Sequence, residues 1–198
     1  MTEQASEDTS IQTSSEGHGP LWQREYTARL SGNALAPEKI VQILREDFAD
    51  FSPVGLAAFS NEKTTPLEVG DEMKVVIQGY GECGVRVVHL EPLSFTLRTL
   101  DGHFEAGRIT FGAYRENNEV VALIRSRARS AGRLRHIGYL LLGQKLQEQT
   151  WRIFLENVVE KIGAQQSGEI EVTTAEVKGR LADLGELDTP TFVAKNRS

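Results

Sequence analysis

Hydrophobic and polar residues alternate along several short stretches of this chain, as they do in strands that bury one face of a sheet. In residues 22–30, Trp22, Tyr26 and Leu30 share the apolar parity. Arg24 lies on that parity too, so we expect it near a sheet edge or paired. The connections between successive predicted strands from residue 73 onward are short, so we expect these strands to pair as antiparallel hairpins. Further strands are predicted at residues 73–77, 85–90, 93–99, 108–114 and 120–130, with a buried strand or turn at 55–59.

Two other stretches carry apolar residues at helical spacing. Pro37 suits the first turn of a helix that contains Ile40, Leu44 and Phe48. Residues 133–164 predict a long helix with an unusually broad apolar face, which is expected when a helix is covered on more than one side. The order of elements therefore predicts an α+β fold, in which a curved antiparallel sheet grips a long C-terminal helix.

The two ends of the chain differ from its middle. Residues 1–20 are rich in Ser, Thr, Glu and Gln, and we expect a flexible tail there. Residues 21–164 are expected to form one domain. Residues 165–198 are a largely polar extension, in which Thr174 has the residue type to cap one short helix. Three alternatives follow: this extension docks on the domain, is disordered, or contacts a partner.

Composition narrows the function classes. The chain has 198 residues, 39% of them hydrophobic, and a formal net charge of -6, which argues against general nucleic-acid binding. It lacks an apolar run long enough for a transmembrane segment or a secretory signal, and its single cysteine, Cys83, cannot form an intramolecular disulfide. We therefore expect a cytoplasmic protein with no metal and no cofactor. The sequence does not determine the oligomeric state.

Residues 79–84 spell a GxGxxG pattern. In a dinucleotide-binding fold this pattern lies between a strand and a helix, whose N-terminus holds the pyrophosphate. Here Val85 begins another strand-like run. The glycines are therefore better explained by a tight hairpin that needs positive φ angles.

The stretch from Thr99 to Gly107, with the preceding strands and Phe111, resembles an uncharacterised bacterial and plant family, a domain of unknown function. The family pattern is T-L-x-G-H-x-E-A-G, usually followed by a second acidic residue; here Arg108 stands in that place. The family is similar to the START-like, or Bet v 1-like (SRPBCC), superfamily. This resemblance implies a helix-grip fold over roughly residues 22–162, with a cavity between sheet and helix.

The residues add an independent observation at Glu105. Glu105 and His103 share parity with Ile109 and Phe111, so both side chains are expected on the apolar side of their strand. A buried carboxylate is costly unless it is paired or protonated. Two interpretations follow: these side chains satisfy groups at the turn after Gly102, or they contact a ligand in a pocket.

Arg125, Arg127 and Arg129 alternate along a predicted strand and so form one column. In one interpretation, the small and apolar opposite parity faces inward and the column lies on a solvated outer face. In the other, Val121 and Leu123 define the inner parity, and Arg125 enters the cavity to pair with Glu105 or an anionic ligand group.

Three hypotheses for function follow. The first is a binding protein for a small hydrophobic or amphipathic molecule, oriented by His103, Glu105 and Arg125. The second is a cyclase-like or hydrolase-like enzyme with Glu105 or His103 as acid or base. The third is an interaction protein with a solid core that binds partners through the basic face Arg125–Arg135. The apolar cavity lining is predicted to be Phe95, Leu97, Phe111, Tyr139, Leu142, Trp151 and Phe154.

Overall fold

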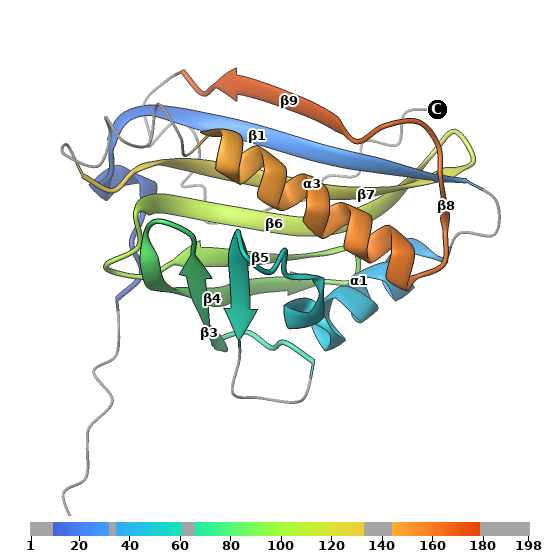
Figure 1. Cartoon of the computed structure of the whole chain (residues 1–198), viewed down its shortest axis with the longest axis horizontal. Coiled ribbons are helices and arrows are strands. Elements are labelled where there is room, and N and C mark those ends of the chain that lie inside the picture. Colours follow the sequence, from blue (N-terminus) through green and yellow to red (C-terminus); the bar gives the residue numbers. More distant parts are fainter. Residues whose placement is uncertain (1–9, 32–34, 61–65, 133–143, 179–198) are drawn as a thin grey trace, which may run out of the picture.

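The computed structural model describes residues 10–31, 35–60, 66–132 and 144–178, and within them the chain has an α+β fold (Figure 1). Two α-helices, α1 (Pro37–Glu46) and α3 (Gln144–Lys161), and two short 3-10 helices, η1 (Ser14–Glu16) and η2 (Phe48–Phe51), accompany one large antiparallel sheet. Its strands are β1 (His18–Ser31), β2 (Ala57–Ser60), β3 (Glu72–Ile77), β4 (Gly81–Glu91), β5 (Ser94–Thr99), β6 (Glu105–Glu116), β7 (Glu119–Ser130), β8 (Gln165–Gln166) and β9 (Glu171–Glu176).

The order of strands in the sheet follows the chain except at β1. From β2 to β7 each strand pairs with the next in sequence, as the short connections predict, and β1 then pairs with β7. On its other side, β1 pairs with both β8 and β9. The first strand of the chain is therefore an inner strand of the finished sheet.

The N-terminal segment differs from the predicted flexible tail over residues 10–20. Ile11 forms a bridge with Leu100, and the Gln12 backbone N–H donates to the Thr99 carbonyl at 2.8 Å. η1 follows, and β1 begins at His18. Polar composition did not reveal this segment because backbone hydrogen bonds, rather than apolar burial, hold it.

The GxGxxG pattern forms the β3–β4 hairpin, as predicted. Gly79 and Gly81 have φ angles of 81° and 97°, a region that residues with a Cβ rarely adopt. Ile77 lies opposite Gly81, and a strand follows rather than a helix. Cys83 lies in β4, opposite Val75, just beyond the turn.

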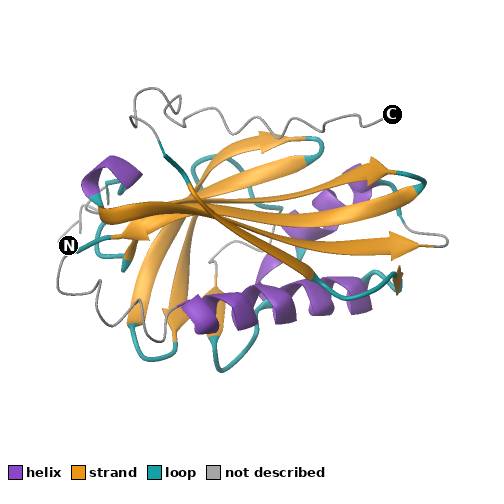
Figure 2. Ribbon diagram, turned by 90° about the horizontal axis from the view of Figure 1, so that it is seen from above, coloured by secondary structure: helices purple, strands orange, loops and turns teal. Residues whose placement is uncertain are grey.

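α3 lies across one face of the sheet (Figure 2). The predicted helix spans residues 133–164, of which 133–143 lie outside the described residues. Between helix and sheet is an aromatic core centred on Phe48, whose ring centroid lies 4.9 Å from that of Phe111 and 5.2 Å from that of Phe154. Such edge-to-face and tilted contacts stabilise a core beyond the area that they bury.

The C-terminal extension contains strands where a helix is predicted. Thr174 lies in β9, opposite Arg24 of β1, so it does not cap a helix. Pairing with β1 satisfies the backbone groups of this polar segment without an apolar face of its own. The remainder of the predicted short helix, from residue 179 onward, lies outside the described residues.

Two kinds of feature are absent from the described part of the chain. It contains no helix that is both long and apolar enough to cross a membrane. It also contains no group of three or more His, Cys, Asp or Glu side chains placed to hold a metal ion.

Candidate functional site

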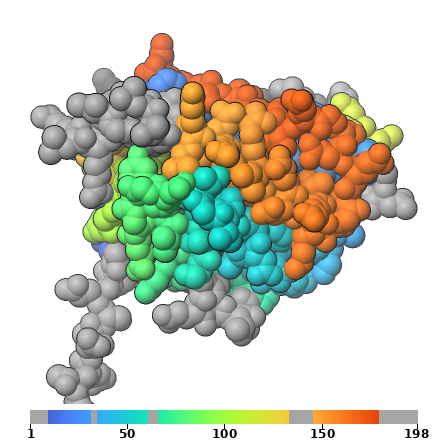
Figure 3. All heavy atoms as spheres, viewed as in Figure 1, coloured from blue at the N-terminus to red at the C-terminus, as the bar shows by residue number. Residues whose placement is uncertain are grey.

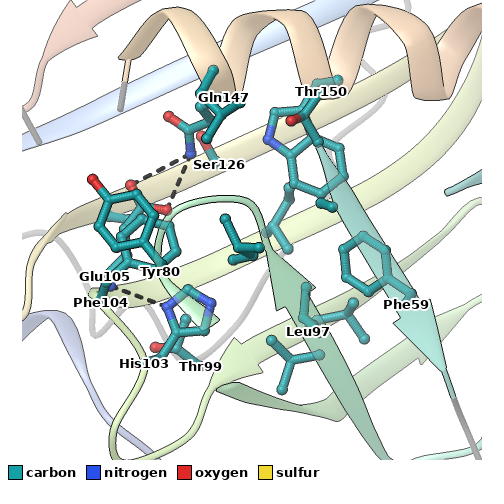
Figure 4. A pocket seen from close by; sticks show the side chains of 18 of the residues that line it. Phe59, Tyr80, Leu97, Thr99, His103, Phe104, Glu105, Ser126, Gln147 and Thr150 are labelled. Carbon is teal, nitrogen blue, oxygen red and sulfur yellow. Dashed lines mark hydrogen bonds between the residues drawn. The ribbon is translucent and has the colours of Figure 1, made fainter. Parts of the chain in front are cut away.

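A pocket of about 80 Å³ lies between α3 and the sheet, where the helix meets β2 and the β3–β4 hairpin. These elements lie next to one another on the molecular face drawn in Figure 3. The pocket is lined by Ala57, Phe59, Val75, Ile77, Tyr80, Val85, Leu97, Thr99, His103, Phe104, Glu105, Arg108, Ile109, Ser126, Ala128, Leu146, Gln147, Thr150 and Trp151. Most of these side chains are apolar, but a few polar groups gather at one side (Figure 4).

The stretch from Thr99 to Gly107 builds that polar side. The Gly107 N–H donates to the Thr99 hydroxyl at 3.0 Å, which ties the end of β5 to the start of β6. A Cβ at Gly107 would lie 2.2 Å from the Arg127 carbonyl oxygen, so this position has no room for a side chain. Gly102 makes the intervening turn with a φ angle of 89°. The motif residues thus set the local backbone path.

His103 is buried and neutral. Its Nδ1 accepts a hydrogen bond of 3.0 Å from the Glu105 backbone N–H, so the ring proton lies on Nε2. Burial lowers the pKa of His103 to about 4. The edge of the ring that carries Nε2 is turned toward the pocket (Figure 4), where it can donate a hydrogen bond.

Glu105 is held from several sides. Its side chain lies on the buried face, with 7% of the residue exposed. The Gln147 amide of α3 donates to the Glu105 carboxylate, at 3.1 Å to Oε2 and 3.4 Å to Oε1. The Gln12 amide donates to the Glu105 backbone carbonyl at 2.7 Å and to that of His103 at 3.1 Å. The carboxylate therefore has a fixed position at the pocket wall.

Two further polar atoms are buried at this pocket. The Ser126 hydroxyl and the Trp151 indole N–H are both inaccessible to solvent, and neither has a hydrogen-bond partner in the described residues. Leaving a buried polar group without a partner costs on the order of 1–3 kcal/mol. A ligand with a polar atom near Ser126 or Trp151 would offset that cost.

Aromatic rings lie beside the polar groups at the outer side of the pocket. Tyr80, at the tip of the β3–β4 hairpin, stacks on Phe104 with ring centroids 4.4 Å apart. Phe104 stacks in turn on His103 at 4.7 Å. Tyr80 is 39% exposed, so this stack reaches from solvent to the pocket wall.

Apart from the column of Arg125, Arg127 and Arg129, the predicted site residues fall into three groups. Leu97, His103, Glu105 and Trp151 line the pocket. Phe95, Phe111 and Phe154 do not; they are fully buried in the aromatic core, where side chains fill the space. The other predicted residues lie outside the described part of the chain: Tyr139 and Leu142 of the lining, and Arg133 and Arg135 of the basic face.

The prediction that Arg125 enters the cavity is wrong. Arg125 is absent from the pocket wall, and its Nε donates to the Glu25 carboxylate of β1 at 2.7 Å. Strand parity explains the difference: Ser126 faces the pocket, so its neighbour Arg125 faces the other side of the sheet. The interpretation in which the column lies on the outer face is therefore the correct one.

Sequence reasoning missed several pocket residues. Gln147 precedes Trp151 by four residues, so both lie on one face of α3, and this spacing was an available signal. Ser126 alternates with the arginines of the column, so the interpretation that places the column on the outer face also places Ser126 on the inner face. Gln12 carried no signal, because its contact joins residues more than 90 positions apart.

Cys83 does not supply a nucleophile near this site. Burial, followed by the nearby Glu105 charge, raises the pKa of the Cys83 thiol to about 12. The thiol therefore stays protonated at neutral pH, and thiolate is the reactive form. With His103 neutral as well, the charged side chains in the lining of the pocket are Glu105 and Arg108.

No family model and no curated protein matches this chain. Solved structures do. Norcoclaurine synthase from Thalictrum flavum, in complex with dopamine and hydroxybenzaldehyde, is 7% identical over 72% of this chain and 86% of its own, with a TM-score of 0.52. A protein from Thermobifida fusca is 13% identical over 71% of this chain and 93% of its own, with a TM-score of 0.50. A protein from Arthrobacter aurescens is 12% identical over 71% of this chain and 86% of its own, also with a TM-score of 0.50.

At such low identity these likenesses show the fold alone. Norcoclaurine synthase has the Bet v 1-like α+β fold, and the large antiparallel sheet and two α-helices of the described residues are consistent with that fold. The resemblance of the Thr99 to Gly107 stretch to an uncharacterised family stays a prediction, since no family model matches.

Proposed function

We propose that this protein binds a small amphipathic molecule in the pocket between α3 and the sheet, and that the sheet curls around the helix to enclose it. The observation that carries the proposal is the pairing of an apolar wall with buried polar atoms on one side, Ser126 Oγ and Trp151 Nε1 among them. Ligand sites in proteins have this composition: mostly apolar, with a few polar groups that fix orientation.

The pocket volume limits the ligand. A water molecule needs roughly 10–15 Å³ measured in this way, so about 80 Å³ accommodates roughly five to eight non-hydrogen groups. A single ring with a short polar arm is of that size. Phe59 and Leu97 lie across the pocket from the polar groups, where they would contact the ring (Figure 4).

The polar end of the ligand is expected to be a hydrogen-bond donor, and a cation in particular. The Glu105 carboxylate is fixed at the pocket wall and accepts from Gln147. A ligand amine near Glu105 would gain a charge-assisted hydrogen bond, whereas a ligand carboxylate would be repelled. The dopamine in the norcoclaurine synthase structure is also a ring with an amine arm, although that concerns the other protein alone.

The enzyme hypothesis receives less support from these residues. With a pKa of about 4, His103 is deprotonated at neutral pH and is a poor general acid there. Its Nδ1 is already occupied by the Glu105 backbone N–H, so it is not available as a base. Binding without catalysis requires none of these groups to change protonation.

The test compares three ligands of one size: benzylamine, benzyl alcohol and benzoate. The chain has two tryptophans, so a Trp22→Phe background leaves Trp151 as the reporter of pocket occupancy by fluorescence. We expect benzylamine to bind most tightly and benzoate least. Glu105→Gln keeps the side-chain size and should weaken benzylamine binding by roughly tenfold or more.

Glu25→Gln is the matched control, because Glu25 lies on the outer face of the sheet, paired with Arg125. It should leave all three affinities unchanged. Absence of binding by all three compounds, or equal benzylamine affinity in Glu105→Gln, would contradict the proposal. Native mass spectra of the purified protein give an independent measurement, since a co-purifying compound of similar mass should be lost in Glu105→Gln.

A further inference from the structure

Four arginines form a row across the face of the sheet opposite α3. Arg98 on β5 lies directly opposite Arg108 on β6, which lies opposite Arg127 on β7. Arg86 on β4 lies opposite Arg98 and completes this arginine row. Leu97 and Ile109, neighbours of these residues in sequence, line the pocket beside α3, so strand parity directs the arginines to the other face, although Arg108 also borders that pocket.

Such a row is unfavourable by itself. Like charges directly opposite one another on neighbouring strands destabilise a sheet. Arg86 is accompanied by Glu72, to which its Nε donates at 2.9 Å. Among the described residues, no carboxylate lies within 4.0 Å of the Arg127 guanidinium, whose Nε donates to the neutral Gln23 amide oxygen. The pKa of Arg127 is lowered, first by burial and then by the Arg125 charge.

A second, smaller pocket opens at this row. It has a volume of about 20 Å³, and its wall includes Arg98, Arg108, Arg127, Thr13 and Ser14. The Thr13 hydroxyl donates to Glu16 at 2.8 Å, whereas the Ser14 hydroxyl has no hydrogen-bond partner among the described residues. Three arginines and Ser14 therefore line a space for roughly one or two water-sized groups.

We propose that this second pocket binds a tetrahedral oxyanion of the phosphate class, held by Arg98, Arg108 and Arg127 with a hydrogen bond from Ser14. Each guanidinium presents a planar fork of donors, and a phosphate has enough oxygens to accept from three of them. A carboxylate has fewer oxygens and less charge than a phosphate, so it is expected to pair less well with three guanidinium groups. The chain as a whole carries a formal charge of -6, so the attraction is local and suits a small anion rather than a long polyanion.

The two pockets share Arg108, but Arg98 and Arg127 line the second pocket and not the first, so variants at Arg127 test this site separately from the proposed ligand pocket. The phosphate has two possible sources, a free inorganic ion or the terminal group of a phosphate monoester. The arms of the experiment separate them by comparing inorganic phosphate with phenyl phosphate, and both with acetate and with chloride at matched ionic strength.

The measurement is isothermal titration calorimetry on the full chain, supported by the thermal midpoint in each salt. We expect phosphate to bind and to raise the thermal midpoint above that in matched chloride, while acetate does neither. Tighter binding of phenyl phosphate would identify a monoester as the source, and equal or weaker binding would identify the free ion. Arg127→Gln should weaken phosphate binding by roughly tenfold or more.

Arg125→Gln is the matched control, since Arg125 lies two residues away on the same strand and face but is paired with Glu25. It should retain phosphate affinity. Should Arg127→Gln fail to fold, Arg127→Lys keeps the charge but not the fork, and is expected to bind phosphate more weakly than the native chain. Equal effects of phosphate and chloride, equal binding of acetate, or unchanged affinity in both Arg127 variants would overturn the proposal.

Discussion

The backbone N–H of Glu105 donates a hydrogen bond to Nδ1 of His103, and this contact fixes the tautomer of a buried, neutral imidazole at the wall of the pocket. The contact is short in sequence but joins the turn after β5 to the first residue of β6. It requires that His103 remain unprotonated at Nδ1, which makes the fold sensitive to acid.

Stability should therefore fall as the pH is lowered from about 6.5 to about 4. His103 has a pKa of about 4 in the folded chain and 6.5 ordinarily, so in this window the unfolded chain binds more protons. The loss contributed by His103 is at most about 3 kcal/mol. Urea unfolding at several pH values measures it, and His103→Gln should flatten the profile between pH 4 and 6.5. If the dependence of the unfolding free energy on pH is unchanged in His103→Gln, other groups cause the acid sensitivity. His89→Gln is the control variant.

Gly107→Ala should destabilise the protein strongly. The new Cβ would lie 2.2 Å from the Arg127 carbonyl oxygen and 2.7 Å from the Ala128 Cα, and backbone of a central strand cannot easily move away. We expect a loss on the order of 3 kcal/mol in the free energy of unfolding, measured by urea titration. Gly132→Ala is the control, because nothing lies within 4 Å of its added Cβ. Similar losses in both variants would refute the steric explanation.

The Arg125–Glu25 ion pair should contribute little to the free energy of unfolding. Its atoms are 2.7 Å apart, but both side chains are about 30% exposed, at 31% and 28%. A double-mutant cycle with alanine at each position should give a coupling energy of roughly 0.2–1 kcal/mol. Arg125→Ala should also leave benzylamine binding unchanged, since Arg125 does not line the pocket. A large drop in that affinity would restore the interpretation in which Arg125 faces inward.

Cys83 should react slowly with alkylating reagents. A thiol with a pKa of about 12 contains very little thiolate at pH 8, so iodoacetamide should modify the native chain roughly a thousandfold more slowly than the unfolded chain. The reaction is followed by mass spectrometry with and without urea, and Cys83→Ser gives the blank. Comparable rates in the two conditions would show that the thiol is accessible and ionisable in the fold.

Strand parity accounts for most of what the sequence predicted correctly. Parity with Ile109 and Phe111 placed Glu105 on the apolar face, and its side chain is indeed buried. The hairpin at Gly79 and Gly81 followed from the strands on either side of it. These arguments succeed because they need only local geometry, which each stretch of sequence carries by itself.

What the sequence did not predict depends on contacts between distant segments. Gln12 contacts the carbonyls of His103 and Glu105, and the arginine row exists only because four strands align in one register. Phe95 and Phe111 were predicted to line a cavity, but their rings lie 5.2 Å apart and fill the core. Whether an apolar face encloses space or is packed solid depends on side chains from several elements, so no single stretch of sequence decides it.

The position of β1 also has a consequence for how quickly the chain can fold. Glu25 on β1 lies opposite Arg125 on β7, one hundred residues later, and opposite Thr173 on β9. Folding rates fall as contacting residues lie further apart in the chain, because loop closure must precede the pairing. A ribosome would release β1 long before either partner strand exists. We therefore expect slow, late closure of the sheet, with both edges of β1 exposed to chaperones or to other chains in the meantime.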